Sequence, residues 1–238
     1  MFIITMKETF FCILNFFVFP LKPPSKEVPM NIILLHGLGQ SPAAWDEVIK
    51  GSPLLQDSRC PNLFTLPGRK SDSYQALFDA FSQYCQQQPK PLHLCGLSLG
   101  GLLALDYAGK YPQQVASLVL IGIPHRIPPV LMGLQDLVFR FAPDSVVGGT
   151  GLSREGLRSL CRSMARLEPS SWLPAVQCPT LVLCGQRDRA NRRSACMVEK
   201  GLARSQVELI PGAGHEVNRD APEILRTRLE AFYDSLEK

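Results

Sequence analysis

From residue 30 onward, short runs of apolar residues alternate with longer stretches in which apolar residues recur at helical spacing. The short runs, bounded by glycine or proline, predict strands buried on both faces, and the longer stretches predict helices. Strands are expected at 31–35, 62–66, 91–95, 115–121, 180–184 and 206–210, and helices at 71–88, 100–111 and from 222 onward. This alternation predicts an α/β fold with a mostly parallel central sheet of about six strands and flanking helices.

The alternation stops between Pro124 and Pro179, where helical patterns continue without a convincing strand. We interpret residues 124–178 as a helical insertion over the carboxyl edge of the sheet. Ligands bind at that edge in open α/β sheets, so the insertion is a candidate lid. Residues 30–238 are otherwise expected to form one domain.

Residues 1–29 have a different character. Phe10 to Phe19 form an apolar run interrupted by Asn15, and a proline-containing stretch follows. The run is too short for a transmembrane helix, which needs about twenty apolar residues. We interpret 1–29 as an N-terminal extension outside the core, with Met30 as a possible native start. We expect a cytoplasmic protein; a signal peptide is the alternative, although no small-residue cleavage site follows the run.

Composition narrows the class of partner. The chain has 45% hydrophobic and 19% charged residues and a net charge of +4, without a block of like charges. This favours a globular protein with a small-molecule substrate and gives no reason to expect nucleic acid. The eight cysteines form no C-x-x-C pair and no zinc-ligand spacing. We therefore expect neither a metal nor a cofactor, and the oligomeric state stays open.

A G-x-S-x-G pattern occupies residues 96–100, with Ser98 at its centre. The pattern is weak alone, but here it follows an apolar strand and opens a helix, which is the context of a nucleophile on a sharp strand-to-helix turn. A phosphate-binding turn is the alternative, yet the sequence has neither a Walker A loop nor a dinucleotide-binding loop. Ser98 is the predicted nucleophile.

A serine nucleophile needs a base, and the base needs a carboxylate. His215 ends the small-residue loop 211–215 after the last predicted strand, and Asp188 follows the strand at 180–184. Both should therefore project from the carboxyl edge of the sheet. The chain order Ser98, Asp188, His215 is the order that the G-x-S-x-G hydrolases use.

Other candidates for these roles are less well placed. His93 falls inside a strand, and His36 begins a turn that it is expected to support. His125 enters the insertion, where it is a candidate substrate contact. Asp106 is the rival acid, but it lies within the helix after Ser98 and should point away from the site.

Residues 30–238 resemble the compact branch of the α/β-hydrolase superfamily that has a small helical lid. The matching stretches are 36–39 (His-Gly-Leu-Gly), 96–101, 185–188 and 212–215. The resemblance implies an oxyanion hole made by the backbone N–H groups of Leu38 and Leu99. Such donors contribute on the order of 3 kcal/mol each to lowering the barrier of acyl transfer.

The sequence departs from several branches of that superfamily. Position 98 is not the aspartate of epoxide hydrolases and haloalkane dehalogenases, and the Gly-Gly-Ser-Trp-Gly elbow of proline iminopeptidases is absent. The menaquinone-pathway synthase would carry an arginine where this chain has Leu102. These three activities are therefore weakened.

The predicted lid has an apolar stripe and a basic stripe. Arginines recur every four residues opposite leucines and a methionine: Arg154, Arg158, Arg162 and Arg166. A solvated basic face is the favoured interpretation, and attraction of an anionic substrate or membrane surface is the alternative. A second arginine cluster, with the same two interpretations, surrounds Asp188: Arg187, Arg189, Arg192 and Arg193. Met132 and Trp172 are candidate contacts in an apolar acyl pocket.

The resulting prediction is hydrolysis of a carboxylic ester, or a related acyl substrate, through an acyl-serine intermediate. Two different functions remain open beside it. One is cofactor-free C–C bond cleavage or elimination on the same fold. The other is a hydrolase-like protein that binds a ligand without turnover.

Overall fold

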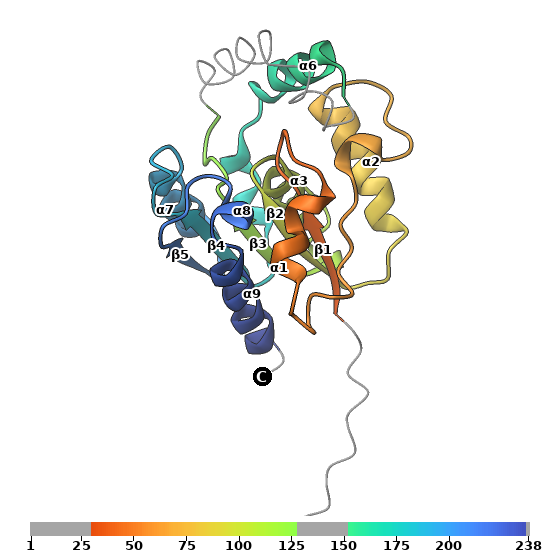
Figure 1. The fold of residues 1–238 in the computed structure, drawn as a ribbon. Coiled ribbons are helices and arrows are strands. Elements are labelled where there is room, and N and C mark those ends of the chain that lie inside the picture. Colours follow the sequence, from red (N-terminus) through yellow and green to blue (C-terminus); the bar gives the residue numbers. More distant parts are fainter. Residues whose placement is uncertain (1–29, 128–151, 237–238) are drawn as a thin grey trace, which may run out of the picture.

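The computed structural model describes residues 30–127 and 152–236 (Figure 1). Residues 1–29 and residues 128–151 of the predicted insertion lie outside the described residues. In the described ranges, one sheet contains five parallel strands in the spatial order β1-β2-β3-β4-β5. The strands are β1 (Asn31–Leu35), β2 (Leu92–Leu97), β3 (Val115–Ile121), β4 (Thr180–Gly185) and β5 (Ser205–Ile210). Because all five are parallel, their carboxyl ends meet at one edge of the sheet.

One of the six predicted strands, at 62–66, is wrong. Leu63–Thr65 form a turn of 3-10 helix, and the chain pairs with β1 through an isolated bridge at Arg59. Two features end the pairing after that bridge. Pro61 has no N–H with which to extend a ladder, and the Asn62 side chain accepts a hydrogen bond of 3.1 Å from the N–H two residues later, as a helix cap does.

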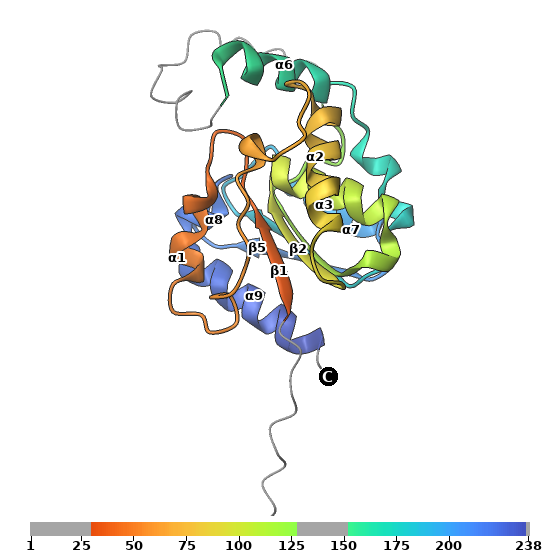
Figure 2. The same cartoon turned by 90° about the vertical axis from the view of Figure 1, so that its right-hand side faces the viewer.

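Helices cover both faces of the sheet. They are α1 (Asp46–Ile49), α2 (Tyr74–Gln86), α3 (Leu99–Lys110), α6 (Arg154–Met164), α7 (Arg192–Lys200), α8 (Val217–Asp220) and α9 (Pro222–Leu236). α2, α3 and α7 lie on one face, and α1, α8 and α9 lie on the other (Figure 2). Each face has its own core because successive strand residues point to opposite sides. In β1, Ile33 and Leu35 belong to the first core, whereas Ile32 and Leu34 belong to the second.

Helix α6, in the described part of the insertion, packs over the amino-terminal end of α2 (Figure 1). Ser163 in α6 accepts a hydrogen bond of 2.8 Å through its hydroxyl from the N–H of Tyr74, the first residue of α2. The predicted apolar stripe of this helix is buried, with Leu157 and Leu160 essentially inaccessible to solvent. The stripe therefore anchors α6 to the domain.

Two general features of the described residues bear on the class of protein. No helix in these ranges combines the length and the apolar character that crossing a membrane requires. The cysteines in the same ranges are free thiols, and most are buried, as small core residues are.

Candidate active site

Ser98 lies at the sharp turn between β2 and α3. Its backbone has a φ of 52° and a ψ of −112°, and it is the one non-glycine residue with positive φ in the described ranges. A Cβ on Gly96 would lie 2.4 Å from the carbonyl of Gly100, and a Cβ on Gly100 would lie 2.4 Å from the Leu35 carbonyl oxygen. Only glycine fits at these two positions, so packing of bare backbone holds Ser98 in a strained conformation at the end of β2.

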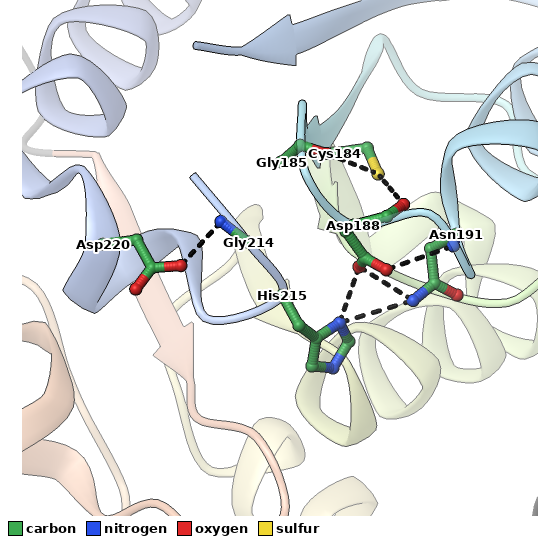
Figure 3. A network of polar contacts seen from close by, with 7 residues as sticks. All are labelled: Cys184, Gly185, Asp188, Asn191, Gly214, His215 and Asp220. Carbon is green, nitrogen blue, oxygen red and sulfur yellow. Dashed lines mark hydrogen bonds and ion pairs between the residues drawn. The ribbon is translucent and has the colours of Figure 1, made fainter. Parts of the chain in front are cut away.

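Asp188 and His215 meet at the ends of the two neighbouring strands, β4 and β5 (Figure 3). His215 Nδ1 lies 2.8 Å from Asp188 Oδ2. The carboxylate side chain is 5% exposed, whereas the imidazole is 45% exposed. An ionised carboxylate only accepts hydrogen bonds, so Nδ1 carries a proton, and in the neutral form of the ring Nε2 then presents the lone pair. Figure 3 shows this second ring nitrogen pointing away from Asp188.

The carboxyl end of β3 joins the two parts of the site. Ser98 N–H donates a hydrogen bond of 2.8 Å to the carbonyl of Ile121, the last residue of β3. The next residue, Gly122, lies against the acid and the histidine: a Cβ there would be 3.2 Å from His215 Nδ1 and 3.7 Å from Asp188 Oδ2. The three predicted catalytic residues therefore converge on two consecutive residues of the chain.

The hydroxyl of Ser98 and His215 Nε2 are not hydrogen bonded to each other within the described residues. Catalytic hydrogen bonds often tighten only when substrate is bound. The roles of Ser98, Asp188 and His215 accordingly remain predictions that this convergence supports.

Asn191 is a further site residue that the sequence did not reveal. Its side-chain amide donates to Asp188 Oδ2 at 2.9 Å, and its backbone N–H donates to Asp188 Oδ1 at 3.2 Å (Figure 3). Burial, the largest influence, acts to raise the pKa of Asp188, but the hydrogen bonds from His215 and Asn191 outweigh it and lower that pKa. Asp188 is therefore held as a carboxylate. An asparagine three residues after an acid has no motif that would have identified it.

The loops after β4 and β5 also touch each other directly. A Cβ on Gly185 would lie 1.9 Å from the carbonyl oxygen of Gly214, so the two loops approach as closely as backbone allows. Asp220, at the end of α8, accepts a hydrogen bond of 2.6 Å from Gly214 N–H (Figure 3). This bond fixes the residue that precedes His215. Asp220 is a second supporting residue that no sequence motif indicated.

The predicted oxyanion donors belong to the loop after β1, which carries Leu38, and to the start of α3, where Leu99 is the first residue. A Cβ on Gly37 would lie 2.8 Å from the Leu97 side chain, next to Ser98, so the loop after β1 sits against the elbow. In the described part of the chain, the backbone N–H groups of Leu38 and Leu99 have no hydrogen-bond partner. Free donors on both sides of the serine are what an oxyanion hole requires. The assignment itself remains a prediction.

His36 supports that loop, as its position indicates. Its Nδ1 lies 2.9 Å from the Gly37 carbonyl oxygen, and its Nε2 accepts a hydrogen bond of 3.1 Å from Leu63 N–H. The ring is fully buried, and burial lowers its pKa, against the smaller raising effect of the Gly37 carbonyl. His36 is therefore a neutral structural histidine.

Three further titratable groups make their contacts elsewhere or stay protonated. His93 is buried and 2.9 Å from the Ser117 hydroxyl. Asp106 accepts a hydrogen bond of 3.3 Å from the Tyr74 hydroxyl on the α2 side of the sheet. Cys184 is closer to the site, with Sγ 4.0 Å from the Asp188 carbonyl oxygen, but burial, with a smaller contribution from Asp188, raises its pKa to about 12. That thiol stays protonated.

The three predicted substrate contacts have different outcomes. Trp172 stacks on Tyr74, with ring centroids 6.2 Å apart, and its backbone packs against Gly109 near the far end of α3 from Ser98. These contacts give Trp172 a packing role, and its predicted contact with substrate stays a prediction. His125 is partly buried, three residues after Gly122, and stays a candidate. Met132 lies outside the described residues.

The arginines of the predicted basic stripe are not equivalent. Glu155 pairs with Arg158 at 2.9 Å and with Arg162 at 2.5 Å. Arg166 instead lines a cavity of about 390 Å³ together with Arg126 and Glu168, between the start of the insertion and the segment after α6. Near the catalytic loop, the four arginines around Asp188 are at least partly exposed.

No cluster of three or more His, Cys, Asp or Glu side chains is placed to hold a metal ion in ranges 30–127 and 152–236.

The sequence profile of the alpha/beta hydrolase family matches residues 32–227. This range contains the sheet apart from its first residue, Asn31, together with the elbow and both loops of the Asp188–His215 pair. The protein therefore belongs to the alpha/beta hydrolase family, which confirms the fold class predicted from the sequence.

Individual relatives are distant. Human monoacylglycerol lipase ABHD6 is 23% identical over 244 residues, which cover 81% of this chain and 72% of the lipase. A Bacillus subtilis protein with the provisional name 2-succinyl-6-hydroxy-2,4-cyclohexadiene-1-carboxylate synthase is 23% identical over 248 residues, covering 86% of this chain and 90% of its own. An esterase from Thermogutta terrifontis superposes with a TM-score of 0.68 at 22% identity, covering 88% of this chain and 91% of the esterase. The structural likeness shows the fold, and the names of the relatives include more than one reaction.

Proposed function

We propose that this protein is a serine hydrolase that cleaves a carboxylic ester, or a related acyl substrate, through an acyl-serine intermediate. In this proposal Ser98 is the nucleophile, His215 the general base and Asp188 the acid that orients the histidine. The observation that carries it is the 2.8 Å hydrogen bond between Asp188 Oδ2 and His215 Nδ1 at the same sheet edge as the strained serine. That bond assigns the lone pair to Nε2, the atom that must accept the serine proton.

The first half of the reaction follows from these roles. Nε2 of His215 takes the proton from Ser98 Oγ as Oγ attacks the substrate carbonyl carbon. The carbonyl oxygen becomes negative and is stabilised by the free N–H groups of Leu38 and Leu99. His215 then gives its proton to the departing alcohol, so the C–O bond breaks and an ester of Ser98 remains.

Water completes the cycle. His215, again with Nε2 unprotonated, removes a proton from a water molecule that attacks the acyl carbon. The same two N–H groups stabilise the second oxyanion, and the proton returns to Ser98 Oγ as the carboxylic acid leaves. Asp188, buried and held ionised by Asn191, stabilises the imidazolium in both halves.

The surroundings of the site belong to the proposal as well. Residues 30–238 would form the catalytic domain, and the insertion at 124–178 would act as its lid over an apolar acyl pocket. The free thiols of the described residues are compatible with a reducing compartment, so we place the protein in the cytoplasm.

Elimination or C–C cleavage is the second candidate, because the Bacillus relative bears the name of a synthase. At the position after the double glycine of the elbow, this chain has Leu102, which is 2% exposed and packed in the core. A buried leucine supplies no charge for an anionic substrate, so ester hydrolysis is the better supported activity.

Labelling with a fluorophosphonate tests the activated serine. We expect the parent protein to be labelled and both Ser98→Ala and His215→Ala to lose labelling. Ser171→Ala is the matched control, because Ser171 is an exposed serine whose hydroxyl bonds to the Glu168 carbonyl, outside the site. A folded parent that is not labelled would contradict the proposal and favour a binding protein.

Comparing kcat/KM for aryl esters with acyl chains of two to twelve carbons then measures the size of the acyl pocket. Turnover of a β-diketone, with none of any ester, would favour C–C cleavage over the proposed ester hydrolysis.

A further inference from the structure

A buried pair of side-chain amides connects the loop after β1 with the segment that follows His215. Gln40 and Asn218 are each 1% exposed. Gln40 Nε2 donates to Asn218 Oδ1 at 3.2 Å, and Asn218 Nδ2 donates to Gln40 Oε1 at 3.2 Å. Gln40 Oε1 also accepts a hydrogen bond of 3.1 Å from the backbone N–H of Gly37. The pair therefore joins residues far apart in the sequence through reciprocal hydrogen bonds.

The orientation of both amides follows from one fixed donor. A backbone N–H can only donate, so the Gln40 atom that faces Gly37 N–H must be its oxygen. The amide nitrogen of Gln40 then faces Asn218, which must answer with its own oxygen. Reversing either amide would place two donors or two acceptors together in a buried site, which is costly. The pair has one satisfied arrangement.

One end of the pair holds the peptide that precedes the one carrying the proposed oxyanion donor. Gln40 holds the N–H of Gly37, and His36 Nδ1 holds the carbonyl oxygen of the same residue at 2.9 Å. The peptide bond between Gly37 and Leu38 is planar and trans, so fixing its carbonyl points the Leu38 N–H in the opposite direction. The backbone N–H of Gln40 donates to the same carbonyl at 3.2 Å, so Gln40 holds Gly37 on both sides, and the direction of the Leu38 donor depends on Gln40 together with His36.

The other end of the pair lies in the segment that positions the histidine. Asn218 belongs to the short helix α8, which begins two residues after His215. The same helix ends with Asp220, whose carboxylate accepts the hydrogen bond of 2.6 Å from Gly214 N–H. His215 therefore lies between Gly214, which is hydrogen bonded to Asp220 of α8, and the start of α8 itself.

We propose that Gln40 and Asn218 are positioning residues that keep the Leu38 oxyanion donor and the His215 base in one fixed relative geometry. This inference rests on the proposed function. Neither side chain touches the reacting atoms, so the pair acts through the two loops that it joins. Small displacements of preorganised groups reduce the rate of reaction more than they reduce substrate binding.

Variants with apolar side chains of similar shape, Gln40→Met and Asn218→Leu, test the proposal. For an ester that the parent hydrolyses, we expect kcat to fall about tenfold to hundredfold in each variant, with KM changed less than about twofold. The double variant should be no slower than the slower single variant, because the two residues act as a unit. Thr180→Val is the matched control: it removes a buried side-chain hydrogen bond of 3.2 Å at the opposite end of β4 and should keep kcat.

The substitution Asn218→Asp provides a milder test through pH. A protonated carboxyl has one donor and one acceptor, so it can replace the amide opposite Gln40. An ionised carboxylate has only acceptors, and Gln40 cannot turn because its oxygen is held by Gly37 N–H. The ratio of kcat in this variant to kcat in the parent should therefore fall as pH rises through the pKa of the new carboxyl, while far-UV circular dichroism stays native.

Three results would overturn the inference: kcat unchanged in folded Gln40→Met, additive losses in the double variant, or a kcat ratio for Asn218→Asp that does not vary with pH. If the apolar variants do not fold, the pH profile of Asn218→Asp decides alone. Failure of the proposed function is separate, because it appears in the parent as an absence of phosphonate labelling and of ester turnover.

Discussion

The two parts of the candidate site are built by different means. The elbow that carries Ser98 is held by backbone against backbone, with Gly96 and Gly100 in positions where a single methyl group would collide with a carbonyl. The loops of the Asp188–His215 part also meet backbone against backbone, at Gly185 and Gly214, but side chains orient the acid and the base, because the Asp188 carboxylate bonds to His215 and Asn191. The elbow therefore depends on the absence of a Cβ atom at two glycines. The orientation of the acid and the base depends on the side chains that bond to Asp188.

This difference determines what a substitution in each part should change, the fold or only the activity. A side chain added to the elbow meets backbone that cannot move without separating α3 from the sheet, so fold and activity should be lost together. A side chain removed from the Asp188–His215 part leaves the backbone in place and disturbs orientation. Activity should then fall while the fold remains. Substitutions in the two parts therefore distinguish damage to the fold from damage to the site.

The largest effect is expected for Gly100→Ala. The new methyl group would lie 2.4 Å from the Leu35 carbonyl oxygen, and overpacking of this kind destabilises a protein by about 3 kcal/mol. We expect the midpoint of urea unfolding to fall and phosphonate labelling of Ser98 to be lost.

Gly51→Ala is the control for that substitution. Gly51 has a φ of 78°, and its nearest neighbour to a new Cβ is a side-chain atom at 3.9 Å, so only backbone strain opposes the alanine. The Gly51→Ala variant should lose about 1 to 2 kcal/mol of its free energy of unfolding and should keep full phosphonate labelling of Ser98. Equal losses in the two variants would show that steric contact does not define the elbow.

A smaller effect, confined to activity, is expected for Asn191→Leu. The substitution removes the side-chain hydrogen bond of 2.9 Å to Asp188 Oδ2, one of the bonds that keep the carboxylate in place. A hydrogen bond to a charged group contributes about 1.5 to 3 kcal/mol, so kcat/KM should fall about tenfold to hundredfold. Steady-state kinetics with an aryl ester measures this.

Ser205→Ala is the matched control on the same side of the sheet. The Ser205 hydroxyl donates to the Glu199 carbonyl at 2.9 Å, which ties β5 to α7 at the end remote from Asp188. It should keep kcat/KM within about twofold. An equal loss of activity in both variants would mean that Asn191 acts through general stability and not through Asp188.

The same difference explains what could be predicted from the sequence. Where two stretches of backbone touch, only glycine fits, and such glycines form a recognisable pattern in the sequence. The pattern at residues 96–100, between a predicted strand and a predicted helix, therefore predicts the elbow. The order of Ser98, Asp188 and His215 was readable because each follows a predicted strand. The side chains that hold the second part have no such pattern, and neither Asn191 nor Asp220 was found.

The features that the sequence did not reveal have physical causes as well. Residues 62–66 have the apolar character of a strand, but Pro61 and the Asn62 cap turn the chain away from the sheet, and hydropathy alone does not register this. Trp172 was assigned to a pocket because a large aromatic near a cleft must be buried somewhere. In the structure its ring is partly buried and stacks on Tyr74, a contact that no spacing in the sequence indicates.

Acid should destabilise the loop after β1 and the Asp188–His215 part in separate pH ranges. Burial lowers the pKa of His36 from its ordinary 6.5, so the folded protein binds this proton less readily than the unfolded chain. The associated stability is complete above pH 6.5 and is lost as pH falls towards the folded-state pKa, by up to about 1.4 kcal/mol per pH unit. The lowered pKa of Asp188 acts in the same direction but below its ordinary 3.8.

Urea unfolding at pH 8, 7, 6 and 5 measures the loss of stability in the pH range that His36 determines. His93, whose pKa burial also lowers, should contribute there, so His36→Gln and His93→Gln should each flatten the curve in part. A parent whose stability does not change between pH 7 and 5 would contradict the neutral, buried state of both histidines.

The smallest effect concerns the cavity of about 390 Å³ that Arg126 and Arg166 line, where neither backbone contact nor a buried hydrogen bond defines the geometry. Both arginines are accessible to solvent, so water and salt screen their attraction for an anion, which amounts to less than about 1 kcal/mol each. We expect Arg126→Gln and Arg166→Gln to lower kcat/KM about threefold for an ester with a terminal carboxylate and to leave the matched methyl-terminated ester unchanged. Glu168→Gln removes the acid that lines the same cavity and should change kcat/KM for the charged ester in the opposite direction. Raising the salt concentration should abolish the effects of all three substitutions on the charged ester, because salt screens the attraction between exposed charges. Equal effects on both esters would show that the cavity does not receive the charged end of the substrate.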